Sequence, residues 1–299
     1  MLSYNQEAYI ENALVSLLQQ NLEGLEIVIS DDASSDMTVK IIRKVLDASK
    51  TEKKIKLNIN SKNIGIVANL NKAIGLTTGD LIFIAGGDDI SKKTRCSDCY
   101  KFWLESGAKH DLVATDGYDM SKGGVNLGIK VTDNLEEWTL QRWHQETRPY
   151  FFGASHMITK KLVNLNSLDT YLPFEDQVYV HRALMMGGAI RLPKPLVYHR
   201  RGGVSQPEGS MLVGSKKQRL LLGANANLIE LNQFVTDASK LGKESTVNEL
   251  IQSKYALETY TKKILESKTF FDKINIFVRA KKISFSKRVR FLKYSLFYN

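Results

Sequence analysis

Hydrophobic residues along most of the chain alternate between helical and strand-like spacing. Ile10, Leu14, Leu17 and Leu18 lie at helical spacing, and an apolar strand-like run follows within residues 25–30. The alternation recurs, with strand-like segments at residues 55–59, 80–85 and 112–115 and helical segments at residues 39–46 and 67–74. Repeated βα units predict an α/β fold with a mainly parallel sheet and helices on both faces.

Both ends of the chain depart from this pattern. Residues 2–5 lead directly into the first helix, without the strand that normally opens such a sheet. We expect either that the native chain begins upstream or that the sheet lacks its first strand. From about residue 216 the pattern becomes helical and polar, which predicts an α/β domain at residues 1–215 and a helical, basic extension at residues 216–299.

The carboxyl-terminal tail, residues 271–299, carries most of the net charge of +10, with eight Lys or Arg residues against Asp272 alone. Phe285, Val289, Leu292 and Leu296 form an apolar stripe among these cations at helical spacing. Apolar residues interleaved with cations favour an anionic membrane surface over nucleic acid as the partner. A helix that is solvated or packed against the core is the alternative.

The composition, with 43% hydrophobic and 25% charged residues, is that of a globular protein. No stretch is apolar enough to span a membrane, and no signal peptide is visible. Cys96 and Cys99 cannot form a disulfide framework, so we expect a cytoplasmic protein. The basic tail adds the expectation that it is peripheral at the inner face of the cell membrane. Their C-x-x-C spacing is compatible with redox chemistry or metal binding, but a second ligand pair for zinc is missing.

Two strand-like segments end on paired carboxylates. One is followed by Gly-Gly-Asp-Asp at residues 86–89, and the other by Asp31 and Asp32. The carboxyl ends of strands in an α/β sheet open onto the ligand crevice, and glycines let the backbone approach a ligand closely. Carboxylates there suit Mg²⁺ or Mn²⁺ that holds a diphosphate. A solvated turn is the alternative for either segment taken alone.

Five short motifs, SYNQE, SDDASSD, NIG, GDD and ED, occur in this order at residues 3–7, 30–36, 63–65, 87–89 and 175–176. In this order and at these spacings the chain resembles the family 2 glycosyltransferases of the GT-A fold, of the type that builds bacterial surface polysaccharides. The resemblance implies transfer of a sugar from a nucleotide-diphospho-sugar, such as a UDP- or dTDP-sugar, to a hydroxyl of a saccharide or lipid-linked acceptor.

The resemblance also implies roles for individual residues. Those implied to bind the nucleotide-sugar are Ser3, Tyr4, Asp32, Asn63, Gly65 and Asp88. Within this set, Asp32 would accept a hydrogen bond from the base, and Asp88 would face the ribose or a metal-bound water. Asp89, with Asp88 beside it, is implied to bind Mn²⁺ or Mg²⁺, which would neutralise the diphosphate leaving group.

The segment at residues 172–177 resembles the region of the family that supplies the general base. Asp176 is implied to take the proton of the acceptor hydroxyl, and Glu175 to orient or bind the acceptor. A single attack by the activated hydroxyl predicts inversion at the anomeric carbon. From the residues alone, both acids could also stand in the first turn of a helix, where negative charge is favourable.

The resemblance is imperfect after this helix. Many relatives place an Arg and then a His in a loop over the diphosphate, whereas here His199 precedes Arg200 and Arg201. We expect Arg200 or Arg201 to bind the phosphates instead, because a guanidinium suits them. Residues 151–156, which include His156, resemble the small-residue segment beside the donor sugar and the acceptor.

The predicted function is inverting, metal-dependent glycosyl transfer in O-antigen or capsule biosynthesis. One alternative is a catalytically silent module that binds a nucleotide-sugar or scaffolds a membrane complex, which the absent first strand would favour. A nucleotidyltransferase is less favoured, because a Gly-rich, basic loop near the amino terminus is not visible.

Overall fold

The computed structural model describes residues 1–202 and 215–297, and the chain divides into two compact units. Unit 1 comprises Met1–Thr170 and Phe174–Pro207, and unit 2 comprises Tyr171–Pro173 and Glu208–Asn299. The predicted boundary after residue 215 stays a prediction, because residues 203–214 on its amino-terminal side lie outside the described part of the chain.

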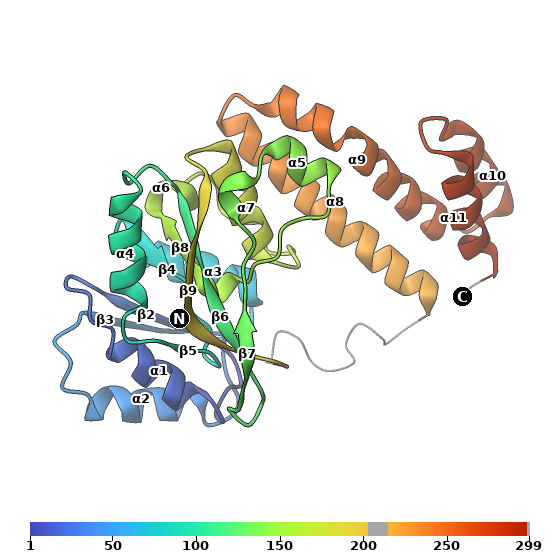
Figure 1. Ribbon diagram of the computed structural model, residues 1–299. Coiled ribbons are helices and arrows are strands. Elements are labelled where there is room, and N and C mark those ends of the chain that lie inside the picture. Colours follow the sequence, from blue (N-terminus) through green and yellow to red (C-terminus); the bar gives the residue numbers. More distant parts are fainter. Residues whose placement is uncertain (203–214, 298–299) are drawn as a thin grey trace. The chain divides into compact units, whose positions relative to one another are not determined.

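Unit 1 begins with a wholly parallel 3-stranded sheet in the order β1-β2-β3 (Figure 1). The strands are β1 (Leu2–Ser3), β2 (Ile27–Asp31) and β3 (Ile55–Ile59), with Leu2 opposite Ser30 and Ile27 opposite Ile55. The expectation of a missing first strand is therefore wrong. A strand of two residues is too short to show hydrophobic alternation, so only the structure reveals it.

A 6-stranded sheet continues the structure in the order β4-β8-β6-β9-β5, with β7 paired to β6. Its strands are β4 (Leu81–Phe83), β5 (Ile90–Ser91), β6 (Leu112–Met120), β7 (Asn126–Lys130), β8 (His156–Thr159) and β9 (Ala189–Arg200). β6 and β9 are parallel, and the other neighbours in this sheet are antiparallel. An isolated parallel bridge pairs Leu2 of β1 with Gly86, which lies in the segment after β4.

Helices cover both faces of the first sheet, as the sequence predicts. Ile27 and Ile29 of β2 pack against α1 and α2, whereas Ser30 on the opposite face donates a hydrogen bond to Asn69 of α3 at 2.6 Å. The helices of unit 1 are α1 (Ile10–Leu18), α2 (Thr38–Ala48), α3 (Ile66–Gly75), α4 (Arg95–Glu105), α5 (Leu140–Gln145), α6 (Lys160–Val163) and α7 (Glu175–Met185), with 3-10 turns at Leu135–Glu137 and Gly153–Ser155. Strand alternation thus produces an α/β/α arrangement.

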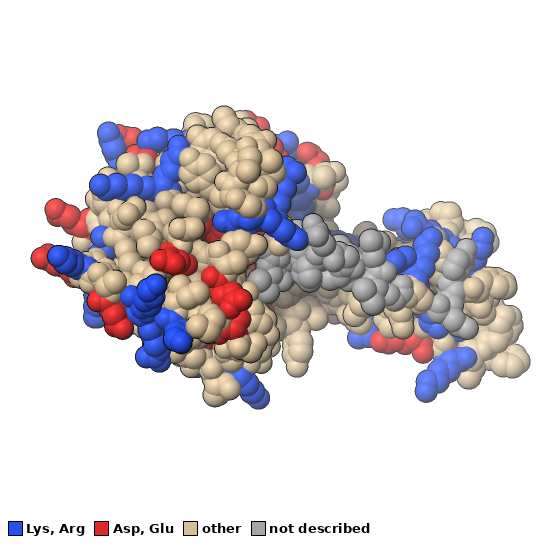
Figure 2. All heavy atoms as spheres, turned by 90° about the horizontal axis from the view of Figure 1, so that it is seen from below, with Lys and Arg blue, Asp and Glu red and all other residues tan. Residues whose placement is uncertain are grey.

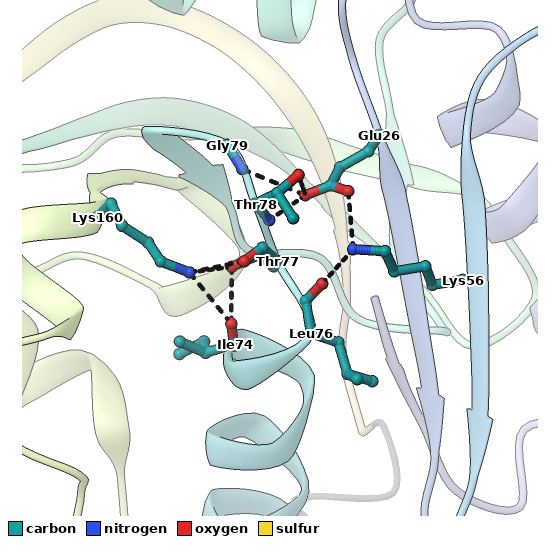
Figure 3. Close-up of polar contacts among 8 residues, drawn as sticks. All are labelled: Glu26, Lys56, Ile74, Leu76, Thr77, Thr78, Gly79 and Lys160. Atoms are coloured by element: carbon teal, nitrogen blue, oxygen red, sulfur yellow. Dashed lines mark hydrogen bonds and ion pairs between the residues drawn. The ribbon is translucent and has the colours of Figure 1, made fainter.

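A polar cluster at Glu26 fastens the connection between α3 and β4 (Figure 3). The Glu26 carboxylate accepts hydrogen bonds from both the backbone and the hydroxyl of Thr78 and from the Gly79 N–H, and it pairs with Lys56 at 3.2 Å. Lys160 of α6 binds the carboxyl end of α3 in the same connection. Burial raises the pKa of Glu26, but these hydrogen bonds outweigh burial and lower the pKa to about 2. The cluster fixes where β4 begins.

The described residues 215–297 of unit 2 form helices joined by short turns. Its helices are α8 (Lys216–Lys240), α9 (Glu244–Glu266), α10 (Phe270–Arg279) and α11 (Phe285–Phe297). Ser215 and Gln218 form a capping box that starts α8. Tyr260 and Ile264 of α9 form the centre of a cluster that packs α10 and α11. None of the described helices has both the length and the apolar character required to cross a membrane.

Candidate functional site

The loops that follow β1 and β2 are hydrogen-bonded to each other. The hydroxyls of Ser3 and Ser34 each donate to Oδ2 of Asp31 at 2.7 Å, and the carboxamide oxygen of Asn5 accepts from the Ser35 N–H at 2.9 Å. Asn5 adopts a φ of 47°, a left-handed conformation that Asn tolerates better than most residues. The hydroxyl of Ser3 is therefore used within the protein, and Tyr4 beside it is half-buried.

Asp32 ties the end of β2 to the loop before α3. Its Oδ1 accepts hydrogen bonds from the Asn60 side chain and the Ile64 N–H, both at 2.9 Å, and its Oδ2 accepts from the Gly65 N–H at 2.8 Å. Oδ1 of Asn63 accepts from the same Gly65 N–H at 3.0 Å. A carboxylate offers about four acceptor positions, so Asp32 retains one for a further donor. The structure thus brings Asp32, Asn63 and Gly65 together.

Two glycines bring the backbone unusually close to its surroundings after β4. A Cβ on Gly87 would overlap Oε1 of Gln6 and would lie 3.1 Å from the carbonyl oxygen of Leu2. A Cβ on Gly86 would lie 2.8 Å from Oδ1 of Asp88 and 3.1 Å from Oδ2 of Asp89. The two carboxylates therefore converge on the space that the missing side chain of Gly86 leaves open.

The Asp88–Asp89 pair is poorly solvated. Burial raises the pKa of Asp89 to about 6, and burial together with the charge of Asp89 raises the pKa of Asp88 to about 6. Two adjacent, partly desolvated carboxylates are stabilised in their charged form by a cation. Mg²⁺ and its chemical analogues commonly bind through one or two carboxylates, with substrate phosphates and water as the remaining ligands. The residues present therefore fit a divalent ion.

Asp88 and Asp89 alone would not complete the coordination of a divalent ion. Among residues 1–202 and 215–297, no group of three or more His, Cys, Asp and Glu side chains could hold a metal ion. Asp88 and Asp89 would supply two carboxylates, and oxygens of a diphosphate would supply further ligands.

Arg200 is built into the backbone around this pair. Its N–H donates to Oδ1 of Asp89 at 2.9 Å, and its guanidinium donates to the carbonyl oxygens of Asp88 at 3.0 Å and Lys122 at 2.7 Å. The guanidinium also lies over the ring of Tyr9, 4.2 Å from its centroid. These contacts favour a structural role for Arg200 over phosphate binding.

Arg201 differs from its neighbour in exposure. Its side chain is 63% exposed and forms an ion pair with Asp119. An exposed guanidinium at the end of β9 can reorient toward a ligand at little cost, because surface ion pairs contribute little. Of the two predicted phosphate-binding arginines, Arg201 is the one that the structure leaves accessible.

Lys130 and His199 form a pair that the sequence did not predict. Nζ of Lys130 lies 3.0 Å from Nδ1 of His199 and 3.5 Å from Oδ1 of Asp119. Burial, with the charge of Lys130, lowers the pKa of His199 to about 4, so this imidazole is neutral at pH 7. Because an ammonium only donates, Nδ1 accepts and the proton lies on Nε2. In this arrangement His199 offers an N–H donor rather than a metal-binding lone pair.

No local sequence pattern identifies Lys130 as a site residue, because it is an ordinary cation on an exposed strand, far in sequence from the Asp pair. The structure brings it close through the pairing of β7 with β6 and of β6 with β9. Three cations, Arg95, Lys130 and Arg200, partly offset the rise that burial causes in the pKa of Asp89. Arg95 of α4 is fully buried. It donates to the carbonyl oxygen of Ile84 at 2.8 Å and so stabilises the segment that follows β4.

Glu175 and Asp176 lie in the first turn of α7 and face Gly153. A Cβ on Gly153 would lie 3.4 Å from Oε1 of Glu175 and 3.8 Å from Oδ2 of Asp176. The neighbouring Phe152 ring contacts His199, with the ring centroids 5.1 Å apart. The small-residue segment therefore connects the acids of α7 to the groups around Asp88. Burial raises the pKa of the Glu175 carboxyl above its ordinary value.

Three residues whose side chains could take part in chemistry lie in the core. His156 is fully buried, and burial lowers its pKa to about 3. Cys96 and Cys99 are buried, free thiols, and burial raises their pKa to about 11 and about 12. Thiols that stay protonated are poor nucleophiles and poor metal ligands. The structure therefore favours packing roles for all three.

Comparison with known proteins identifies the class. Residues 1–164 match the model of the family described as Glycosyl transferase family 2. The chain therefore belongs to the family 2 glycosyltransferases, which confirms the resemblance seen in the sequence. An uncharacterized glycosyltransferase of Haemophilus influenzae is 34% identical over 90 residues, which span 30% of this chain and 27% of that protein. The matched segments span less than half the length of three such relatives.

Solved structures confirm the GT-A fold. S. aureus TarS 1-349 in complex with UDP-GlcNAc superposes with a TM-score of 0.60 at 16% identity, over 98% of this chain and 88% of that one. The mannosyltransferase PcManGT from Pyrobaculum calidifontis, in complex with GDP-Man and Mn²⁺, gives a TM-score of 0.54 at 15% identity, over 99% of this chain and 85% of that one. At such identities the likeness concerns the fold alone.

Proposed function

We propose that this protein is an inverting glycosyltransferase that moves a sugar from a nucleotide-diphospho-sugar to a hydroxyl of a saccharide or lipid-linked acceptor. The observation that carries the proposal is the convergence of Asp88 and Asp89 on Gly86, which pairs with Leu2 of β1. Family membership and the diphosphate chemistry of such a carboxylate pair support it. The alternative of a catalytically silent module is less favoured, because the first strand, whose expected absence supported it, is present.

The proposed roles follow from what each residue can reach. Asp32, Asn63 and Gly65 would hold the nucleoside in the loops after β2 and β3, and the N–H of His199 and the guanidinium of Arg201 would donate to phosphate oxygens. Asp89, with Asp88 beside it, would hold Mn²⁺ or Mg²⁺. When bound, this ion supplies Lewis-acid neutralisation of the departing nucleoside diphosphate.

Asp176 would accept the proton of the attacking hydroxyl, while Glu175 orients the acceptor. Gly153 lets the backbone of the small-residue segment approach both acids, because a Cβ there would lie only 3.3 Å from Cβ of Asp176 and 3.4 Å from Oε1 of Glu175. One displacement by a single activated hydroxyl inverts the anomeric centre. The donor would be a UDP- or dTDP-sugar, and the pathway would be bacterial O-antigen or capsule biosynthesis.

The proposed place of action is the inner face of the cell membrane, reached through the tail at residues 271–299. Of the apolar stripe predicted there, Leu292 packs against the core of unit 2, whereas Phe285 and Val289 are 65% and 42% exposed. Phe271 is 85% exposed on α10. Figure 2 shows Lys and Arg side chains beside broad uncharged surface on this part of the molecule. Cations next to exposed apolar side chains suit an anionic interface.

Two measurements test these proposals separately. Isothermal titration of the full chain with UDP should show saturable binding that requires Mn²⁺, and a chain that binds no nucleotide would contradict the transferase. Sedimentation with phosphatidylglycerol vesicles should be lost when residues 271–299 are deleted. Unchanged sedimentation would show that the tail is a solvated or packed helix.

A further inference from the structure

Unit 2 contains a groove of about 950 Å³ that lies between α9, α10 and the turn that leads to α11. Small-molecule sites in proteins typically enclose roughly 300–1,000 Å³, so the groove is large enough for one ligand. Its apolar lining includes Ile251, Tyr255, Ile276 and Ile283. This groove takes no part in the site around Asp88 and Asp89, since all its lining residues belong to unit 2.

The polar lining of the groove carries one sign of charge. Lys263, Arg279, Lys281 and Lys282 line it, and no Asp or Glu stands among its described lining residues. All four cations are exposed, and none forms an ion pair within the described part of the chain. Four uncompensated cations at the edge of an apolar surface complement a ligand that is anionic at one end and apolar at the other.

We propose that this groove binds one molecule of an anionic phospholipid. The phosphate would lie among Lys263, Arg279, Lys281 and Lys282, and an acyl chain would lie against Ile251 and Ile276. Free phosphate has no apolar part to bury, so the apolar lining favours a phospholipid over free phosphate. The inference rests on the membrane association proposed above and adds a defined site to it.

The test uses a lipid that is monomeric, so that the potential of a membrane surface does not contribute. Dihexanoyl-phosphatidylglycerol, below its critical micelle concentration, is titrated calorimetrically into the full chain, with dihexanoyl-phosphatidylcholine and inorganic phosphate in parallel. Only the anionic lipid should bind well. The double variant Lys281→Glu, Lys282→Glu should weaken its binding at least about tenfold, because like charges then face the phosphate.

The matched control is Lys287→Glu, Lys293→Glu, which makes the same change of charge on exposed residues of α11 outside the groove. Its binding of the lipid should change less than about threefold. Equal losses in the two double variants, or equal affinities for phosphate and the lipid, would overturn the groove as a site. If vesicle sedimentation still requires the tail while the monomeric lipid does not bind, the groove inference fails and the membrane association stands.

Discussion

Arg200 holds Asp89 through the backbone: the Arg200 N–H donates to Oδ1 of Asp89 at 2.9 Å. The guanidinium of the same residue binds the carbonyl oxygen of Asp88, so one buried residue holds both members of the acidic pair, one through its backbone and the other through its side chain. Arg201, the next residue, points into solvent and pairs only with Asp119 among the ion pairs of the described chain. Two adjacent arginines thus have separable roles.

Substitution of each arginine separates these roles. Arg200→Gln should lower the free energy of unfolding by about 2–4 kcal/mol, because buried carbonyl groups lose a charged donor. Arg201→Gln should leave the melting temperature unchanged and raise the KM for the donor. Urea denaturation and donor kinetics on both variants provide the measurement. An Arg200→Gln protein of normal stability with a raised KM would identify Arg200 as the phosphate ligand.

Gly87 should not tolerate a side chain. The Gly87→Ala variant should lose about 1–3 kcal/mol of stability, because the new methyl group overlaps Oε1 of Gln6 and crowds Leu2. Gly79→Ala is the matched control, since a Cβ there meets only the Leu81 carbonyl oxygen at an ordinary 3.6 Å. Thermal melts of both variants measure this difference in stability. Equal melting temperatures would mean that β1 and the loop after β4 are not packed as described.

The Glu26 cluster should give stability a specific pH dependence. The pKa of Glu26 falls from 4.5 to about 2 on folding, so its contribution is complete above pH 4.5 and disappears as the pH falls toward 2. Glu26→Gln should cost about 1 kcal/mol at pH 7, a modest value because water screens a partly exposed cluster. Denaturation at pH 7 and pH 3 should show this difference shrinking in acid. A difference that does not depend on pH would contradict the assignment.

Metal binding should stabilise the protein only with the Asp pair intact. With UDP at about 100 times its Kd, Mn²⁺ should add about 2–3 kcal/mol of stability in a thermal-shift experiment. Asp89→Ala should abolish this gain, whereas Asp98→Ala, which removes an acid of α4 that pairs with Lys194, should not. The same stabilisation by UDP in the presence of EDTA would show that nucleotide binding does not require a divalent ion.

Sequence patterns predicted α1, α2, α3, the helical character of residues 216–297, the strands β2, β3, β4 and β6 and the acidic motifs, because each is local. The two residues of β1 are too few to show a period, and their pairing with Ser30 and Asp31 is visible only in three dimensions. The same holds for Lys130, which reaches His199 through strand pairing across many residues. Arg200 and Arg201 look equivalent in sequence, and only burial separates them.

Asp176 is the proposed general base of the glycosyl transfer. The most direct test is the rate of UDP release, measured with the UDP-sugar that the wild-type protein turns over fastest. Asp176→Asn should lower kcat by about 10²–10⁴-fold while UDP binding and melting temperature stay unchanged. Glu175→Gln, the neighbouring substitution of the same kind, should affect mainly the KM for the acceptor. An Asp176→Asn protein with nearly full kcat would contradict the account.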